Sequence, residues 1–488
     1  MLLLECYVEC DILGCTCDKK HIRDWMTNLL LLKKYNRLGL VTEFRVVIYN
    51  NCELPMRFDR VMSDLAGHLP EVMPNVRSVK FLGRGIFTAE TVEYPELNTT
   101  DAVLAAKAIT KLFPNVTDLR SHVSRIWTPT HNINSLHDDA YPLYEYLLGA
   151  YAAQLWHVQM LIPFPPKVTK LFEFLTSVSL NVQHARPRED LPGIPIRRLR
   201  IVELFQIDAS IPWWMFEVNQ NELNFESLDS LLLEFIHEAG NTLEFHGCSI
   251  PVCFPRLNNL QVTNSSYVYT DIFGHFKDRD LECLTIMDDP TNFTKIKKSA
   301  LKRAKVLKIG HPTGTPFVDK YSVDMVEHLY NLPSNAEKAV LGHIQHPLPK
   351  MIAWDNLRSL RMSASIADKH GLASLLAQLP LLRFFFMDCF SMSKDDAAVT
   401  RFPGQKVMLD KLGQVMDPDD ISLVSKTLTH IEFFVQRTFD VHGFCELLAR
   451  LPNTNYVKIN DEVMFLVMDT LEQVLGVKRP ILFVPASI

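Results

Sequence analysis

A nine-residue unit recurs along this chain and constrains its fold more than any other feature. The unit reads apolar, Pro, any residue, apolar, any two residues, apolar, any residue, apolar. Proline ends a preceding helix and pushes its neighbour toward extended backbone. The unit therefore predicts a helix that stops and a β-strand that follows. Five copies begin at Met73, Phe113, Phe254, Leu379 and Leu451.

The last two apolar positions of the unit lie two residues apart, so a β-strand places both side chains on one face. In the copy that begins at Leu379, we assign the three apolar positions to Leu381, Phe384 and Phe386. We therefore expect the aromatic run 384–386 to lie in the core.

Weaker copies lack the proline but keep the spacing of the three apolar residues. Together with the proline-led copy whose first apolar position is Leu257, they start every 23 to 29 residues between Leu175 and Ala304, which lies within the leucine-rich-repeat period of about 20–29 residues. Elsewhere the steps are longer and uneven, so we expect insertions. Amphipathic helices are predicted before three proline-led copies, at 101–113, 370–379 and 441–451. The weaker copies begin at Val41, Leu155, Leu175, Leu199, Leu228, Leu281, Ala304, Leu357 and Leu428.

Helix, proline and strand in repetition predict an α/β fold. We expect an irregular leucine-rich-repeat-like solenoid with a curved parallel sheet and outer helices. Such arrays present a long concave surface and generally bind other macromolecules on it.

The repeat units resemble those of fungal F-box/leucine-rich-repeat-like proteins. The segments MPNVRSVKF (73–81) and FPRLNNLQV (254–262) carry the resemblance, and LVTEFRVVIY (40–49) resembles the first strand after the F-box region. The resemblance implies a protein-interaction module, the substrate-receptor part of an SCF-type (cullin–RING) ubiquitin ligase. It implies a Skp-type adaptor and a cullin as partners. Residues 1–40 depart from the family pattern, because they contain only HIRDW (21–25) and no Leu-Pro-led helix before it. We expect the F-box itself to be absent, and adaptor binding then depends on an F-box upstream.

Three regions follow from the repeats and the resemblance. Residues 1–40 are expected to be an N-terminal cap or a post-F-box segment, 41–460 the irregular solenoid, and 461–488 a C-terminal cap. Caps are expected because the end repeats of an array would otherwise expose their cores.

Composition argues against several other classes of protein. Fifty basic and 56 acidic residues give a net charge of −6, so no global field draws the chain to nucleic acid or an anionic membrane. No apolar stretch reaches the roughly 18 residues of a membrane span. The ten cysteines form no paired framework, which favours reduced thiols in the cytoplasm or nucleus. We expect protein partners, with no nucleic acid or membrane among them.

Catalytic motifs are not evident in the sequence. The segment 310–314 lacks the Gly-Lys-Ser/Thr ending of a phosphate-binding loop, and neither Gly-x-Ser-x-Gly nor His-Glu-x-x-His occurs. We expect no enzymatic activity, cofactor or metal. An enzyme with a site assembled on insertions and a repeat scaffold without a ligase link are the alternatives. The N-terminal cysteines have the wrong spacing for the usual zinc knuckle, which favours free thiols. They are Cys6, Cys10, Cys15 and Cys17, followed by His21.

Two local features are candidate interfaces. Trp213 and Trp214 lie in a dense aromatic segment, and exposed Trp side chains dominate binding hot spots. The same cluster, if buried, would pack between repeats. A basic run would suit an acidic partner or form the solvated face of a repeat. Its candidate residues are Lys297, Lys298, Lys302 and Arg303.

Overall fold

The computed structural model places the chain in two compact units, each with its own core. Unit 1 comprises Met1–Ile236 and Glu244–Leu257, and unit 2 comprises His237–Leu243 and Asn258–Ile488. The structure describes residues 2–8, 19–49, 72–84, 99–121, 141–161, 172–182, 193–207, 211–217, 223–235, 252–263, 280–287, 304–310, 323–332, 334–346, 348–349, 352–389, 391–392, 424–435, 438–473 and 480–486.

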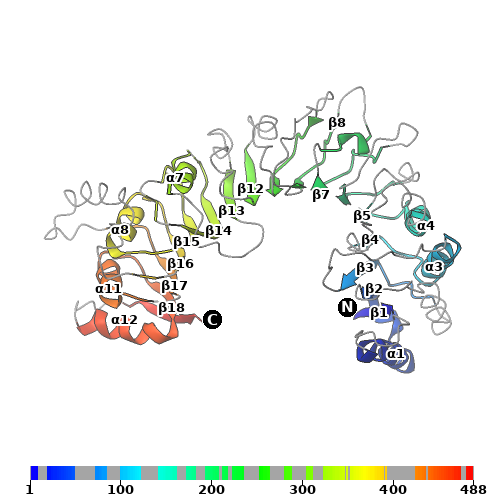
Figure 1. Ribbon diagram of the computed structural model, residues 1–488, viewed down its shortest axis with the longest axis horizontal. Helices are drawn as coiled ribbons and strands as arrows, with labels where there is room; N and C mark the ends of the chain where they lie inside the picture. Colours follow the sequence, from blue (N-terminus) through cyan, green and yellow to red (C-terminus); the bar gives the residue numbers. More distant parts are fainter. Residues whose placement is uncertain are drawn as a thin grey trace, which may run out of the picture. The chain divides into compact units, whose positions relative to one another are not determined.

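Unit 1 is built on a parallel sheet whose strands pair in chain order. Helices α3 and α4 lie on the same side of the strands (Figure 1). A short parallel pair, β8 with β10, lies outside this sheet. The strands are β1 (Leu2–Val8), β2 (Val41–Tyr49), β3 (Ser78–Arg84), β4 (Asp118–Ser121), β5 (His157–Leu161), β6 (Ser177–Asn181), β7 (Ile201–Ile207), β8 (Leu223–Asn224), β9 (Ser230–Phe235) and β10 (Val252–Cys253). The helices are α1 (Lys19–Lys34), α3 (Thr99–Leu112) and α4 (Tyr141–Tyr151), with 3-10 turns η1 (Leu38–Leu40) and η4 (Trp213–Met215).

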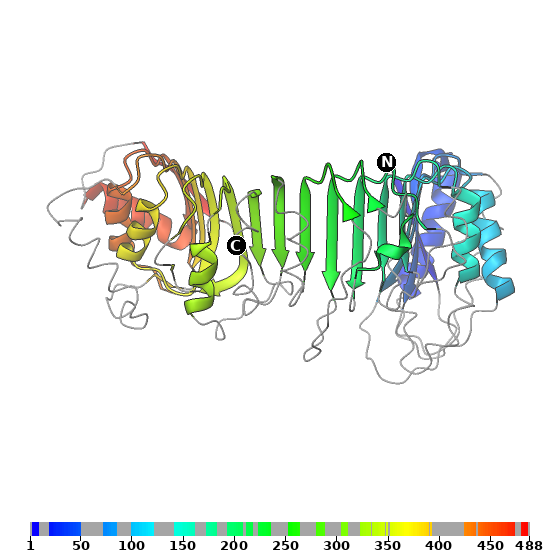
Figure 2. The ribbon, with the colours of Figure 1, turned by 90° about the horizontal axis from the view of Figure 1, so that it is seen from above.

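Unit 2 repeats this plan, and its strands also pair in parallel in chain order. Strands β12 and β13, yellow-green in Figure 2, run side by side in the same direction. Helices α7, α8 and α11 lie together on one side of the strands (Figure 1). The strands are β11 (Asn259–Thr263), β12 (Leu281–Met287), β13 (Ala304–Gly310), β14 (Lys338–His346), β15 (Ser359–Ala364), β16 (Phe384–Cys389), β17 (His430–Val435), β18 (Tyr456–Asn460) and β19 (Leu482–Ala486). The helices are α7 (Val323–Asn331), α8 (Lys369–Ala377), α11 (Val441–Ala449) and α12 (Asp461–Gln473).

The expected inward positions of the repeats form the core of each unit. Alternation along each strand sends these side chains toward the helices and their neighbours toward the opposite face. The fold prediction of an α/β leucine-rich-repeat-like solenoid is confirmed. The buried strand positions include Phe44, Val46, Val79, Phe81, Leu119, Val158, Val178, Leu180, Val202, Leu204, Leu231, Leu233, Leu260, Val262, Leu284, Ile286, Leu307, Ile309, Leu360, Met362, Ile431, Phe433, Val457 and Ile459.

The proline of each unit stands in a tight turn between helix and strand. The amide of Val76 donates to the carbonyl of Met73 at 3.3 Å, and the amide of Leu382 donates to Leu379 at 3.1 Å. Proline suits the second position of such a turn, because its ring presets the required φ. The helices predicted before these turns are present as α3, α8 and α11.

One copy of the unit has a different register from the one predicted. Leu382, Phe385 and Met387 are buried, whereas Leu381 and Phe384 are 42% and 47% exposed. The prediction that the whole aromatic run lies in the core is therefore wrong. A shift of one residue sends every side chain of a strand to the other face.

In five repeats, the side chain immediately before the first apolar position connects the repeat to the preceding one, and in three of the five it follows the proline of the unit. The sequence pattern allows any residue there, but the structure uses it as a hydrogen-bond donor to a backbone carbonyl of the preceding turn, over 2.6–2.9 Å. These bonds satisfy carbonyls that no strand partner reaches. The donor and acceptor pairs are Asn75 with Gly39, Asn115 with Pro74, Gln154 with Pro114, Thr427 with Pro380 and Asn453 with Lys426.

The two regions expected to be caps contain further regular structure. Within residues 1–40, β1 adds a parallel strand beside β2, and α1 follows it. Within residues 461–488, α12 follows β18 directly and β19 pairs with β18. Among the described residues, no helix has the length and apolar character to cross a bilayer.

Candidate functional site

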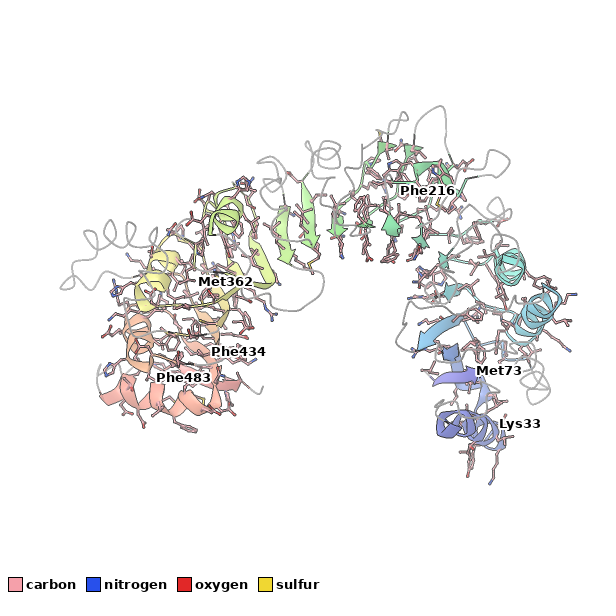
Figure 3. The ribbon with its side chains drawn as sticks, in the orientation of Figure 1. Lys33, Met73, Phe216, Met362, Phe434 and Phe483 are labelled. Atoms are coloured by element: carbon pink, nitrogen blue, oxygen red, sulfur yellow. The ribbon has the colours of Figure 1, made fainter. Side chains whose placement is uncertain are left out.

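Trp213 lies at the edge of an aromatic cluster in unit 1. Its ring centroid is 5.7 Å from that of Phe254, 5.9 Å from Phe225 and 6.3 Å from Phe216. Phe216 is buried within this cluster (Figure 3). Trp213 and Trp214 are both half-buried. Their role as an interface stays a prediction.

The other candidate residues fall largely outside the described parts of the chain. Lys297, Lys298, Lys302 and Arg303 all lie there, as do Cys10, Cys15 and Cys17. Cys6 belongs to β1 and His21 to α1. Within the described residues, no group of His, Cys, Asp and Glu could hold a metal ion.

Over β2 and β3, the outward face of the unit 1 sheet carries paired charges. Glu43 on β2 accepts from Arg45 at 2.5 Å and forms an ion pair with Lys80 on β3 at 3.0 Å. Burial alone would raise the pKa of Glu43, but these hydrogen bonds and charges outweigh it and hold the pKa below its usual value.

Next along the same face, an acid, a histidine and a serine lie in a row. Asp118 accepts from Ser78 at 2.9 Å and from Arg120 at 2.8 Å, and His157 Nδ1 lies 2.7 Å from the Ser177 hydroxyl. The other ring nitrogen of His157 is 3.9 Å from Asp118, which is too far for a hydrogen bond. His157 and Ser177 are therefore within hydrogen-bond reach of each other, but Asp118 does not orient the His157 ring through a hydrogen bond.

The outward face of unit 2 is different, because aromatic side chains cross its neighbouring strands. The register places Phe384 opposite His430, His430 opposite Tyr456, and Tyr456 opposite Leu482. The rings of Phe384 and His430 are 4.7 Å apart, and those of His430 and Tyr456 are stacked at 5.2 Å. At the two ends of this row, Phe384 is 47% and Leu482 60% exposed.

A second row lies beside the first on the same face. The Arg361 guanidinium lies over the Phe386 ring at 4.2 Å, and the Phe386 ring lies 5.4 Å from that of Phe434. Lys458 lies over Phe434 at 5.6 Å and pairs with Glu432 at 3.7 Å. Phe434 lies on the side of the strands away from α8 and α11 (Figure 3).

We call the surface formed by these two rows the aromatic face. Its members are Phe384, Phe386, His430, Phe434, Tyr456 and Leu482. Exposed or half-buried rings fixed by strand pairing present rigid apolar area at low entropic cost, which is typical of a binding surface. The sequence pattern does not predict this face, because it assigns Phe384 and Phe386 to the core.

Comparison with known proteins adds little to this picture. No protein-family model matches the sequence, and the search of curated proteins found no match. Among solved structures, the chain is similar to one described as the crystal structure of the Rad7 and Elc1 complex in yeast. The identity is 10%, the likeness covers 91% of this chain and 74% of that chain, and the TM-score is 0.22. At these values the likeness carries no argument, and the fold assignment rests on the strands and helices described above.

Proposed function

We propose that this chain is a protein-binding module and that the aromatic face of unit 2 is its binding surface. The observation that carries the proposal is the exposure of Phe384 and Leu482 at the two ends of a row of aligned side chains. Apolar side chains of this size lose contact with water when a partner covers them, which contributes about 25 cal/mol for each Å² buried.

The stacking within the face supports a binding role. The ring contacts of His430 on both sides hold three neighbouring side chains in place before any partner arrives. A surface that is already ordered loses less conformational entropy on binding than one whose side chains are free.

We propose, more specifically, that the module is the substrate receptor of an SCF-type ubiquitin ligase. Its support is the resemblance of the repeat units at 73–81 and 254–262 to those of F-box/leucine-rich-repeat-like proteins. In this role the protein positions a partner and performs no chemistry of its own.

Affinity purification of the tagged full chain from its native cells, followed by quantitative mass spectrometry, tests both proposals. For the binding face, the double variant Phe384→Ser/Leu482→Ser is compared with the original chain. Each anchor contributes about 1–2 kcal/mol in a typical hot spot, so we expect recovery of the bound partner to fall by about tenfold or more.

A matched control separates the face from general apolar exposure. Phe465 on α12 is 66% exposed and belongs to a helix, not to the strands of the face. Phe465→Ser should leave recovery unchanged. Equal recovery with the double variant and with this control would overturn the binding role of the aromatic face.

The ligase proposal has its own readout in the same experiment. A Skp-type adaptor and a cullin should be recovered together with the chain, and the face variants should retain them while losing the substrate. A stable partner without either component would overturn the ligase role and leave a repeat scaffold defined by that partner.

A further inference from the structure

We infer that the aromatic face and the cations beside it bind one class of partner, an extended acidic segment that carries apolar anchors. This inference rests on the proposed function, because it names the chemistry of the protein that the same face binds.

The cations lie on the strands that precede the aromatic rows. Lys308 on β13 and Arg361 on β15 stand directly opposite Val340 on β14, one on each side. Lys338 lies two residues before Val340 and therefore on the same face. All three cations are exposed. They form a positive cluster in a chain whose net charge is −6.

This cluster is not neutralised within the described part of the chain. The nearby carboxylates pair with other cations, as Glu282 does with Lys305 at 2.9 Å and Glu432 with Lys458 at 3.7 Å. Among the described residues, Lys308, Lys338 and Arg361 form no ion pair. Exposed cations of this kind contribute modestly to affinity, but they steer and orient an acidic partner.

The spacing of the strands sets the length of the segment. Neighbouring strands lie about 4.8 Å apart, so the distance across the sheet from β13 to β19 is about 29 Å. An extended chain advances about 3.3 Å per residue, so about nine residues cross this distance. Carboxylates over β13–β15 would meet the cations, and apolar side chains over β16–β19 would meet the rings.

A single-stranded nucleic acid is the competing ligand, since basic residues beside aromatic rings also bind bases. Base stacking requires an open ring face. Here the His430 ring is covered on both sides, by the tilted Phe384 ring at 4.7 Å and by the stacked Tyr456 ring at 5.2 Å. The exposed Leu482 at the end of the row also offers no ring to a base. The arrangement therefore favours amino-acid side chains.

Panning a phage-displayed library of random peptides about twelve residues long against the full chain tests the inference. We expect selected peptides to carry Asp and Glu in one half and aromatic or aliphatic residues in the other. Affinities of synthetic copies, measured by fluorescence anisotropy, should fall about tenfold with Phe384→Ser and with Leu482→Ser. Panning on Lys338→Glu/Arg361→Glu should select Lys and Arg in place of the acidic residues.

The controls use exposed residues outside the face. Phe465→Ser on α12 and Lys107→Glu on α3 should leave the selected peptides and their affinities unchanged. Circular dichroism melting verifies that each variant folds. Because Phe384 and Leu482 are substituted separately, one misfolded variant does not remove the test.

The outcomes distinguish the inference from the proposed function. Peptides that need Phe384 and Leu482 but show no acidic preference would overturn the inference and leave the binding face in place. Failure to select any peptide that depends on these residues would overturn both. Tighter, Phe384-dependent binding of a labelled oligouridylate than of the selected peptides would assign the face to nucleic acid and overturn the inference.

Discussion

Tyr151 connects two successive repeats of unit 1 through a buried hydrogen bond. Its side chain is 2% exposed, and its hydroxyl donates to the carbonyl of Phe113 at 2.8 Å. Phe113 directly follows α3, and the last carbonyls of a helix have no hydrogen-bond donor within the helix. A single phenol therefore satisfies a polar group that neither the helix nor the sheet reaches.

Removal of this hydroxyl should destabilise the protein measurably. Tyr151→Phe leaves the Phe113 carbonyl buried without this donor, so we expect a loss of about 1–3 kcal/mol in the free energy of unfolding. Urea denaturation followed by circular dichroism measures it. Tyr146→Phe, on the exposed face of the same helix, should cost far less. Equal losses for the two variants would contradict the account.

Tyr151 also makes the stability of the protein depend on pH. Burial raises the pKa of Tyr151 above its usual value of about 10, and burial raises the pKa of Tyr330 in the same direction. The two neutral tyrosine hydroxyls therefore contribute fully to the free energy of unfolding below about pH 10, the pKa of tyrosine in the unfolded chain. This contribution is lost as the pH rises further. The decrease in stability above that pH should be shallower in Tyr151→Phe than in the original chain.

At the scale of elements, the asparagine after the proline gives the turns at 74–75, 114–115 and 452–453 a second function. The turn reverses the chain, and the side chain that follows donates to the turn before it. The sequence pattern of the unit allows any residue at this position, and it assigns no role to the Pro-Asn pairs at 74–75, 114–115 and 452–453. Their recurrence was a visible signal of a shared hydrogen bond.

Truncation of one of these side chains should loosen the stacking of two repeats. Asn115→Ala removes the bond to the Pro74 carbonyl, and we expect a cost of about 0.5–1.5 kcal/mol in urea denaturation. Asn455→Ala serves as the control, because the backbone of Asn455 makes the strand contacts and its side chain is exposed. A control as costly as Asn115→Ala would refute a specific role for the turn position.

For the whole molecule, two compact units with separate cores predict local responses to core damage. Phe433→Ala on β17 creates a cavity in unit 2, with an expected cost of about 3–5 kcal/mol. In repeat arrays stability depends mainly on nearest neighbours. Hydrogen exchange measured by mass spectrometry should show lost protection in β16–β18 and unchanged protection in β2–β6. Uniform loss across both units would show that they unfold as one.

The sequence by itself determined the repeat, the parallel strands and nearly every inward position. Apolar residues such as Leu204 and Leu360 recur at a strand spacing that only a stacked sheet can bury, so the local pattern carries the information. The strand at 338–346 shows where the apolar pattern in the sequence becomes too weak to identify a strand. Its buried positions are Ala339 and Leu341, and the small alanine weakens the pattern.

Only the tertiary structure decided which face of β16 points outward. Two registers one residue apart satisfy the apolar pattern. One uses Leu381, Phe384 and Phe386, and the other uses Leu382, Phe385 and Met387, so the sequence could not choose between them. Pairing with β15 and β17 selects the register, because it brings Leu382, Phe385 and Met387 under the helices. The same pairing aligns outward side chains from segments far apart in the chain, and the aromatic face exists only through that alignment.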